Sequence, residues 1–174
     1  MSAQTTSYIN DQFVPHDQAL ISVTDRGLLL ADGLFETLSA IDGHVKALSA
    51  HFLRLAQSAK ATGITFNYTE DMIKSIVSQL LADNKLTIGN AAIRLTLTRG
   101  MGSRGLDTPT PCSPTFFVTV SRYLKNEKPL KLRITDTYRR NEHSPTSQMK
   151  TLQYMDNILC RRLAQGAGAD DALM

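Results

Sequence analysis

Along the first two thirds of the chain, segments with the hydrophobic period of a strand are interspersed with segments that have the period of a helix. Apolar and polar residues alternate from Leu34 to Ile41, which predicts a strand, and Asp42-Gly43 predicts a tight turn into a returning strand. A shorter hairpin is predicted around Asn10-Asp11, residues that tolerate left-handed backbone. Strand patterns return at residues 93–97 and 114–123, so these segments together predict a meander of strands.

Other segments carry apolar residues at spacings of three and four, the period of an amphipathic helix. The first of these helices is predicted to have Ser49 as its N-cap and to stop at Gly63. The second runs from about residue 69 to 83 and has a wide apolar face. A strand is predicted in residues 131–140, and a third helix is predicted to begin directly after Lys150.

The order of these elements predicts the α+β class. Strands meander around two helices, and a connector then leads to a new strand and helix. We place an N-terminal α+β domain at residues 1–121, a connector at 122–128 and the start of a second domain at 129–174. The last residues, 172–174, are apolar and typical of a strand entering a sheet, where domains rarely end. Either this strand is only three residues long or the sequence is a fragment, and we expect that it holds only part of the second domain.

Composition narrows the classes of partner. The 174 residues are 42% hydrophobic, which is enough for a sizeable core, and the net charge of +3 is mild. There is no long basic run, so a small anionic ligand fits better than nucleic acid. The two cysteines and four histidines are unclustered, so we expect reduced thiols and no metal site. Without a signal-peptide pattern or an apolar stretch of membrane-spanning length, we expect a cytoplasmic protein and no membrane partner.

A lysine stands where a polar loop gives way to the third predicted helix. A positive charge at a helix N-terminus opposes the helix dipole, so Lys150 is an unusual choice there. Tyr154 follows one helical turn later, so the two side chains can share a face. The alternatives to a functional role are that Lys150 is simply solvated and that Tyr154 is a core residue.

Arginines provide further candidates. The stretch RGMGSRG, residues 99–105, fits neither a Walker motif nor a dinucleotide fingerprint. Its glycines and arginines suit a carboxylate or phosphate, or else form a hairpin end with solvated arginines. Arg54 borders the apolar face of the first helix, where it either snorkels or reaches a phosphate. We interpret residues 24–27, TDRG, as a structural turn stabilised by Asp25.

Four motifs together resemble the class IV aminotransferases, also called fold-type IV pyridoxal-phosphate enzymes. They are VTDRGLLLADGLFETL, LSAHFLRLAQSAKATGI, RLTLTRGMGSRGL and MKTLQYMDNILCRRLAQGAGADDALM. The resemblance covers about residues 7–174, and the order and spacing of the motifs make it specific. It implies a two-domain fold, pyridoxal 5′-phosphate as cofactor, a small-molecule substrate, and a homodimer whose active site lies between the two domains.

The resemblance also implies roles for particular residues. Lys150 matches the lysine that forms a Schiff base with the cofactor, and Arg54 matches the arginine that contacts its phosphate. Tyr154 matches a tyrosine near the phenolic oxygen of the cofactor in branched-chain members. Arg104 and Arg94 fall at or near positions that different members use for a substrate carboxylate. Because the family continues with a glutamate for the pyridine nitrogen and a phosphate-binding loop, we expect the 174-residue chain alone to be inactive.

Within the family, the RGxGxRG loop and the AHFLRL helix favour aminodeoxychorismate lyase. This enzyme converts 4-amino-4-deoxychorismate to 4-aminobenzoate and pyruvate in folate biosynthesis. A transaminase acting on D-amino acids or branched-chain amino acids is the alternative within the family. A non-catalytic fragment or dimerisation module is the alternative from a different class.

Overall fold

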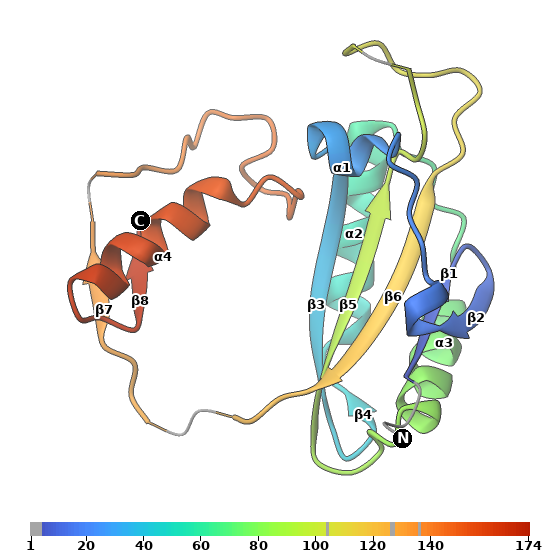
Figure 1. Ribbon diagram of the computed structural model, residues 1–174, viewed down its shortest axis with the longest axis horizontal. Helices are drawn as coiled ribbons and strands as arrows, with labels where there is room; N and C mark the ends of the chain where they lie inside the picture. The colour runs from blue at the N-terminus through green and yellow to red at the C-terminus, as the bar shows by residue number, and fades with distance from the viewer. Residues whose placement is uncertain (1–4, 104, 126–127, 136) are drawn as a thin grey trace.

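Two sheets organise the chain (Figure 1). This computed structural model describes residues 5–103, 105–125, 128–135 and 137–174. The larger sheet is antiparallel, with six strands in the order β2-β1-β6-β5-β3-β4. Its strands are β1 (Thr6–Ile9), β2 (Gln12–Pro15), β3 (Gly33–Ile41), β4 (His44–Val45), β5 (Asn90–Thr98) and β6 (Thr115–Arg122). The smaller sheet pairs β7 (Leu132–Ile134) with β8 (Asp171–Leu173) in parallel.

Two helices cover one face of the larger sheet, which Figure 1 shows behind the strands. Helix α2 (Leu48–Thr62) packs on β3, and α3 (Glu70–Asp83) contacts α2, β1 and β6. The shorter helices are η1 (His16–Gln18) and α1 (Arg26–Leu30), and α4 (Met155–Gly166) leads into β8. This mixed architecture confirms the predicted α+β class.

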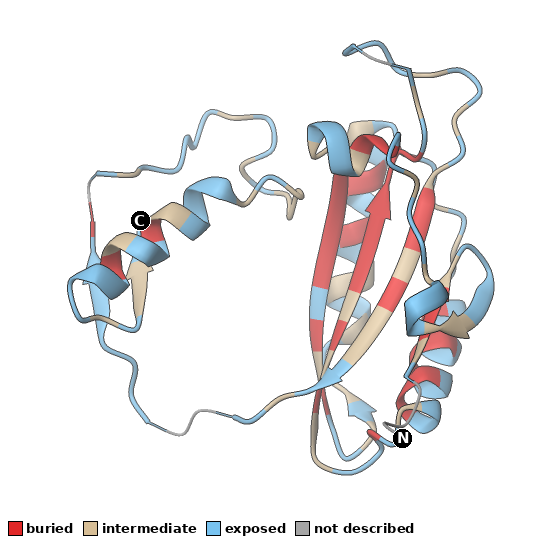
Figure 2. Ribbon diagram, viewed as in Figure 1, coloured by how far each residue is buried: buried red, intermediate tan, exposed pale blue. Residues whose placement is uncertain are grey.

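The core lies between the larger sheet and these two helices (Figure 2). Alternate residues of β3 and β5 point into it, together with one face of α3. Fully buried members include Leu34, Leu38, Ile93, Leu95, Leu97, Ile73, Val77 and Leu80. The same alternation leaves Phe35 and Arg94 on the opposite face of the sheet, away from the helices. The packed layer therefore keeps Phe35 and Arg94 outside this core.

Several local predictions are confirmed. Asn10-Asp11 and Asp42-Gly43 all have positive φ angles, as tight hairpin turns require. Helix α2 ends at Gly63, whose φ of 66° closes the last turn in the left-handed region. Helix α3 covers Glu70–Asp83, close to the predicted bounds, and the hydroxyl of Thr69 caps it by accepting a hydrogen bond from the Met72 amide.

Two local predictions are wrong. The N-cap of α2 is Ala47 rather than Ser49, because the helix begins one residue before the serine. The Ser49 hydroxyl instead donates to Glu70 at 2.6 Å. The strand predicted at residues 131–140 is shorter, since β7 ends at Ile134, level with the last residue of its partner β8.

The turn at residues 24–27 is the structural element that its sequence predicts. Asp25 is fully buried and accepts a hydrogen bond from the Gly27 amide at 2.7 Å. The hydroxyls of Thr98 and Thr115 donate to the other carboxylate oxygen at 2.9 and 2.8 Å. One side chain therefore joins the start of α1 to the end of β5 and the start of β6.

Arg99 is a buried structural arginine, so the interpretation of the loop at 99–105 as one with solvated arginines is wrong at this position. Its Nε donates to Asp32 at 2.7 Å, and its Nη atoms donate to the carbonyls of residues 62–63 at the end of α2. Arg26 donates to the same Asp32 oxygen at 2.9 Å. Burial raises the pKa of Asp32, but the hydrogen bonds from Arg99 and Arg26 outweigh it and leave the pKa lowered.

The predicted connector lies between the two sheets. The larger sheet ends at Arg122, the first residue of the predicted connector, and the smaller begins at Leu132, so the rest of the connector falls in the intervening segment. Residues 126–127 lie outside the part of the chain that the structure describes. The domain boundaries stay a prediction.

Candidate active site

Backbone pairing, not a helix, holds Lys150 in place. Its carbonyl accepts a hydrogen bond from the Phe35 amide at 2.9 Å, and the Leu152 amide donates to the Gly33 carbonyl at 3.0 Å. The segment thus lies along the first residues of β3, on the edge opposite β5. This edge is open there because β4 pairs only with the last two residues of β3. Lys150 is fixed to the same strand that carries Phe35.

The third predicted helix begins later than its hydrophobic spacing suggests. Helix α4 starts at Met155, so the placement of Lys150 at a helix N-terminus is wrong. The reason is the close approach of residues 150–152 to β3, which Gly33 allows. A Cβ at Gly33 would lie 2.7 Å from the Leu97 carbonyl oxygen, with a leucine methyl equally near. Pairing with the sheet therefore takes precedence over helix formation in this segment.

The Lys150 side chain lies against two aromatic rings. Its Nζ lies 4.5 Å from the centre of the Phe35 ring and donates to the Tyr154 hydroxyl at 3.1 Å. The two rings meet edge to face with their centres 4.9 Å apart. The Cζ of Arg94 lies 3.9 Å from the centre of the same Phe35 ring. Two predicted site cations therefore share one aromatic ring.

Arg94 is half-buried, and no described carboxylate balances its charge. Burial lowers its pKa, and the nearby Tyr154 opposes this effect. Among the residues that the structure describes, neither Arg94 nor Lys150 forms an ion pair with a carboxylate. Because a buried charge is costly without a partner, this pair of cations suits an anionic ligand.

Arg54 projects from α2 with 45% of its side chain exposed. Its Nε and one Nη2 hydrogen pair with the two Glu36 oxygens at 2.5 and 2.6 Å. The hydrogen bond to Glu36 raises the pKa of Arg54, burial opposes this, and Tyr154 adds to it. Nη2 also lies 3.3 Å from His51 Nδ1, so the Nη1 group is the part of the guanidinium to which a phosphate can bind.

The predicted site residues converge at the beginning of β3. Those that the structure brings to this region are Lys150, Tyr154, Arg94 and Arg54. Arg104, the other predicted substrate arginine, lies outside the described residues. Tyr154 links the group, because it contacts Lys150 and also influences the pKa of both arginines.

Phe35 and Glu36 are site residues that reasoning from the sequence missed. Phe35 had no signal of its own, since a phenylalanine in a strand is common. Glu36 did have one: it falls in the apolar phase of β3, between Leu34 and Leu38. A charged residue at a core position is a recognisable marker of a paired or functional group.

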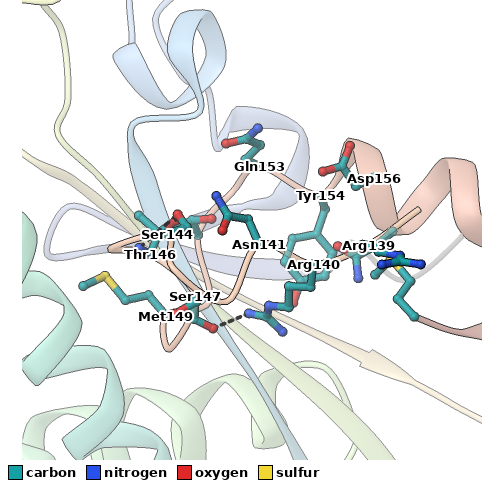
Figure 3. Close-up of a pocket in the computed structure, with 13 residues that line it drawn as sticks. Arg139, Arg140, Asn141, Ser144, Thr146, Ser147, Met149, Gln153, Tyr154 and Asp156 are labelled. Atoms are coloured by element: carbon teal, nitrogen blue, oxygen red, sulfur yellow. Dashed lines mark hydrogen bonds between the residues drawn. The ribbon is translucent and has the colours of Figure 1, made fainter. Parts of the chain in front are cut away.

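A polar hollow of about 210 Å³ also adjoins Tyr154 (Figure 3). The loop that precedes Lys150 and the start of α4 line it, and its cationic residues are Arg139 and Arg140. Arg140 is already engaged, because its Nη2 donates to the Ser147 carbonyl at 2.6 Å. Lys150 is not part of the lining, but its neighbours Met149 and Thr151 and its hydrogen-bond partner Tyr154 are, so the hollow adjoins the cation pair around Phe35.

The described ranges contain neither a metal cluster nor a membrane span. In them, no group of three or more histidine, cysteine, aspartate or glutamate residues has an arrangement that could hold a metal ion. Within the same ranges, no helix is long and apolar enough to cross a bilayer. Cys112 and Cys160 are both free thiols.

Several proteins of known sequence resemble the chain. It is 35% identical to a putative branched-chain-amino-acid aminotransferase of Methanocaldococcus jannaschii, over 96% of this chain and 58% of that protein. It is 28% identical to a D-alanine aminotransferase of Staphylococcus epidermidis, over 97% of this chain and 60% of that protein. It is also 28% identical to an aminodeoxychorismate lyase of Bacillus subtilis, over 89% of this chain and 53% of that protein. The chain thus spans little more than half the length of these relatives.

Solved structures share the fold. A putative 4-amino-4-deoxychorismate lyase from Legionella pneumophila superposes with a TM-score of 0.79 at 27% identity, covering 89% of this chain and 56% of that one. A branched-chain aminotransferase from the archaeon Thermoproteus uzoniensis, solved with norvaline, gives a TM-score of 0.85 at 21% identity. The match covers 98% of this chain and 59% of that one. The chain matches this part of the fold closely.

A fold shared with aminotransferases and lyases defines the class as fold-type IV, as predicted from the motifs. The family profile described as amino-transferase class IV matches residues 33–174, and the chain therefore belongs to this family. Enzymes of the family use pyridoxal 5′-phosphate, and a branched-chain aminotransferase of the same fold has been solved with its amine form, pyridoxamine 5′-phosphate. The predicted cofactor is thereby confirmed.

Proposed function

We propose that the complete gene product is an aminodeoxychorismate lyase. It converts 4-amino-4-deoxychorismate to 4-aminobenzoate and pyruvate as a step in folate biosynthesis. The observation that carries the proposal is the half-buried Arg94 beside Lys150, both without a carboxylate partner among the described residues. A cyclic diacid needs cations at this place, whereas a branched-chain substrate needs an apolar pocket. The similarity to a lyase at 28% identity supports the same reaction.

The residues around Phe35 fit pyridoxal phosphate by their chemistry. When bound, this cofactor supplies an electron sink for bonds at the amino-bearing carbon of the substrate. Lys150 Nζ is an amine that can attach to its aldehyde, and the Nη1 group of Arg54 can bind its phosphate. The Tyr154 hydroxyl orients Lys150 through the 3.1 Å hydrogen bond.

Lys150 also has a role as a base. Once its amine is free, Nζ removes the proton from the ring carbon that bears the amino group. The C–O bond between the ring and the enolpyruvyl group then breaks, the departing enolpyruvate takes up a proton to become pyruvate, and the ring becomes aromatic, which makes the step strongly favourable. Arg94 and Arg104 hold the carboxylates of the substrate during this proton transfer.

A branched-chain or D-amino-acid transaminase is the second candidate. The relative with 35% identity has a branched-chain aminotransferase name, and Arg94 lies near the position that branched-chain members use for the substrate carboxylate. Both reactions need the same cofactor lysine and the same phosphate arginine. They differ in what the substrate pocket accepts and in the product.

The complete gene product should release 4-aminobenzoate and pyruvate in equal amounts from 4-amino-4-deoxychorismate. Chromatography detects the aromatic product, and a lactate dehydrogenase assay detects pyruvate. The control is the same protein without added pyridoxal phosphate. Amino exchange between 2-oxoglutarate and leucine or D-alanine, with no aromatic product, would mean that the enzyme is a transaminase and that the lyase proposal is wrong.

Replacing Arg54 by alanine should weaken pyridoxal phosphate binding by about 1.5–3 kcal/mol, the contribution of a hydrogen bond to a charged group. The guanidinium edge that faces away from Glu36 is lost in this variant. Absorbance titration of the apoprotein measures the affinity. Lys60→Ala is a matched control, because it removes an exposed cation from the same helix. If the wild type and Arg54→Ala had equal affinity for pyridoxal phosphate, Arg54 would have only a structural role.

We also propose a cytoplasmic homodimer that binds neither nucleic acid nor membrane. The segment from Leu20 to Leu30 supports the dimer, since it exposes a run of large apolar side chains. These are Leu20, Ile21, Val23, Leu28, Leu29 and Leu30. The two free thiols support a reducing compartment.

A further inference from the structure

Glu36 is a charged residue in the core. It lies in the apolar phase of β3 between Leu34 and Leu38, and only 1% of it is exposed. A buried carboxylate is costly unless it is paired. Even when paired, such a group often adds nothing to stability compared with an apolar residue of similar size. Stability alone therefore gives no reason for a glutamate at this position.

The contacts of Glu36 point toward Arg54. The Nε and Nη2 atoms of Arg54 donate to the two carboxylate oxygens in parallel, at 2.5 and 2.6 Å. This side-on geometry fixes the plane of the guanidinium as well as its position. The Nη1 group faces away from Glu36, and its donors are available to a ligand, whereas Nη2 also lies 3.3 Å from His51 Nδ1.

His51 supports the carboxylate from one side. Its Nδ1 lies 2.7 Å from the Glu36 oxygen that also accepts from Arg54 Nη2. Because a carboxylate only accepts, the Nδ1 atom carries the proton in this contact, and the 3.3 Å approach of Arg54 Nη2 to the same nitrogen is then not a hydrogen bond. The Glu36 carboxylate is therefore held by two side chains of α2 and has little freedom to rotate.

The carboxylate stays ionised in this environment. Burial raises the pKa of Glu36, but hydrogen bonds from Arg54 and His51 outweigh it, and the pKa is lowered overall. An ionised acceptor is what two simultaneous N–H donors require. Without it, the half-exposed Arg54 would sample many rotamers, and each binding event would have to order it again.

We propose that Glu36 is a positioning residue that orients Arg54 for the cofactor phosphate, with His51 fixing its carboxylate. The inference rests on the proposed function, in which Arg54 binds that phosphate. Glu36 itself is too deeply buried to touch the cofactor. A purely structural Glu36 would neutralise Arg54 without affecting how the phosphate is recognised.

The test compares pyridoxal 5′-phosphate with pyridoxal, which has the same aldehyde and ring but no phosphate. Absorbance titration of the complete apoprotein gives both affinities. In Glu36→Gln the affinity for pyridoxal phosphate should fall about tenfold, the effect of one charge-assisted hydrogen bond. The affinity for pyridoxal should not change. Equal losses for both ligands, or no loss for either, would overturn the inference.

A double-mutant cycle identifies the route of the effect. In an Arg54→Met background, Glu36→Gln should cause no further loss of affinity for pyridoxal phosphate, because Glu36 acts only through Arg54. An additive loss would overturn the inference. Glu36→Leu should repeat the loss of phosphate preference while the protein stays folded, which urea unfolding verifies. Retained phosphate preference in folded Glu36→Leu would also overturn it.

Asp32→Asn is the matched control, because Asp32 is another carboxylate paired with arginines. It should lower the free energy of unfolding but leave the preference for pyridoxal phosphate over pyridoxal unchanged. If Arg54→Met removes this preference and Glu36→Gln does not, the inference fails while the role of Arg54 stands. If Arg54→Met leaves the preference intact, the phosphate role of Arg54 fails, and the role of Glu36 fails with it.

Discussion

Replacing Lys150 by alanine should lower turnover by at least about 10³-fold, since the proposed function makes both the covalent attachment and the proton transfer depend on its amine. Nothing else in the described part of the site supplies an amine there: the groups near Lys150 Nζ are the Phe35 ring and the Tyr154 phenol. The visible absorption of the reconstituted protein should disappear with the side chain. Product release and the absorption spectrum are the two measurements.

Lys60→Ala is the control for this variant, because Lys60 lies exposed on α2. It should keep both the absorption and the turnover. Phosphate binding through Arg54 should survive in Lys150→Ala, so weak non-covalent binding of pyridoxal phosphate should remain. Wild-type turnover in Lys150→Ala would remove Lys150 from the chemistry altogether.

The largest expected effect on stability follows from Asp25→Ala. The substitution leaves the partly buried Gly27 amide and the buried hydroxyls of Thr98 and Thr115 without their common acceptor. Each unsatisfied group costs about 1–3 kcal/mol, and because the Gly27 amide is only partly buried we expect a loss in the lower part of the summed range, roughly 3–5 kcal/mol, in the free energy of unfolding. Urea unfolding of the 174-residue chain, followed by circular dichroism, measures it.

Two further variants test the reason for that loss. Asp25→Asn retains a carbonyl oxygen that two donors can share, so it should cost less than Asp25→Ala. Asp17→Ala removes an exposed carboxylate and should stay within about 0.5 kcal/mol of the wild type. If Asp25→Ala proved as stable as Asp17→Ala, the turn would not depend on its buried carboxylate.

Local sequence signals predicted much of the larger sheet. The turns at Asn10-Asp11 and Asp42-Gly43 depend on a few neighbouring residues, and both have the expected backbone. The stop at Gly63 is a similar short-range effect. Ser49 failed as a cap because the true start of α2 lies at a left-handed alanine, for which sequence offers no comparable signal.

The position of Lys150 depends on distant residues. Its neighbours suited a helix by spacing, but pairing with β3 keeps residues 150–152 extended. The contact between Lys150 and Tyr154 was predicted from a shared helical face, and it exists for a different reason. No pattern within the segment reveals a partner strand about a hundred residues away, which is why the start of α4 was misplaced.

Two charged residues also have partners that are distant in the sequence and that local patterns do not predict. Arg99 stood in a glycine-rich loop and had the composition of a ligand residue, yet it binds Asp32 and the end of α2. Glu36 is the opposite case: its strand gave no prediction of a site residue, yet its carboxylate pairs with Arg54. Charge type and local pattern indicate what a side chain can bind, but the fold decides which partner it meets.

The most direct test of the central claim, that Lys150 anchors the cofactor, is borohydride reduction followed by peptide mapping. The complete gene product is loaded with pyridoxal phosphate, reduced and digested, and the modified peptide is identified by mass spectrometry. We expect the pyridoxyl group on Lys150. A pyridoxyl group on Lys46, Lys60 or Lys85 instead, with Lys150 unmodified, would contradict the assignment.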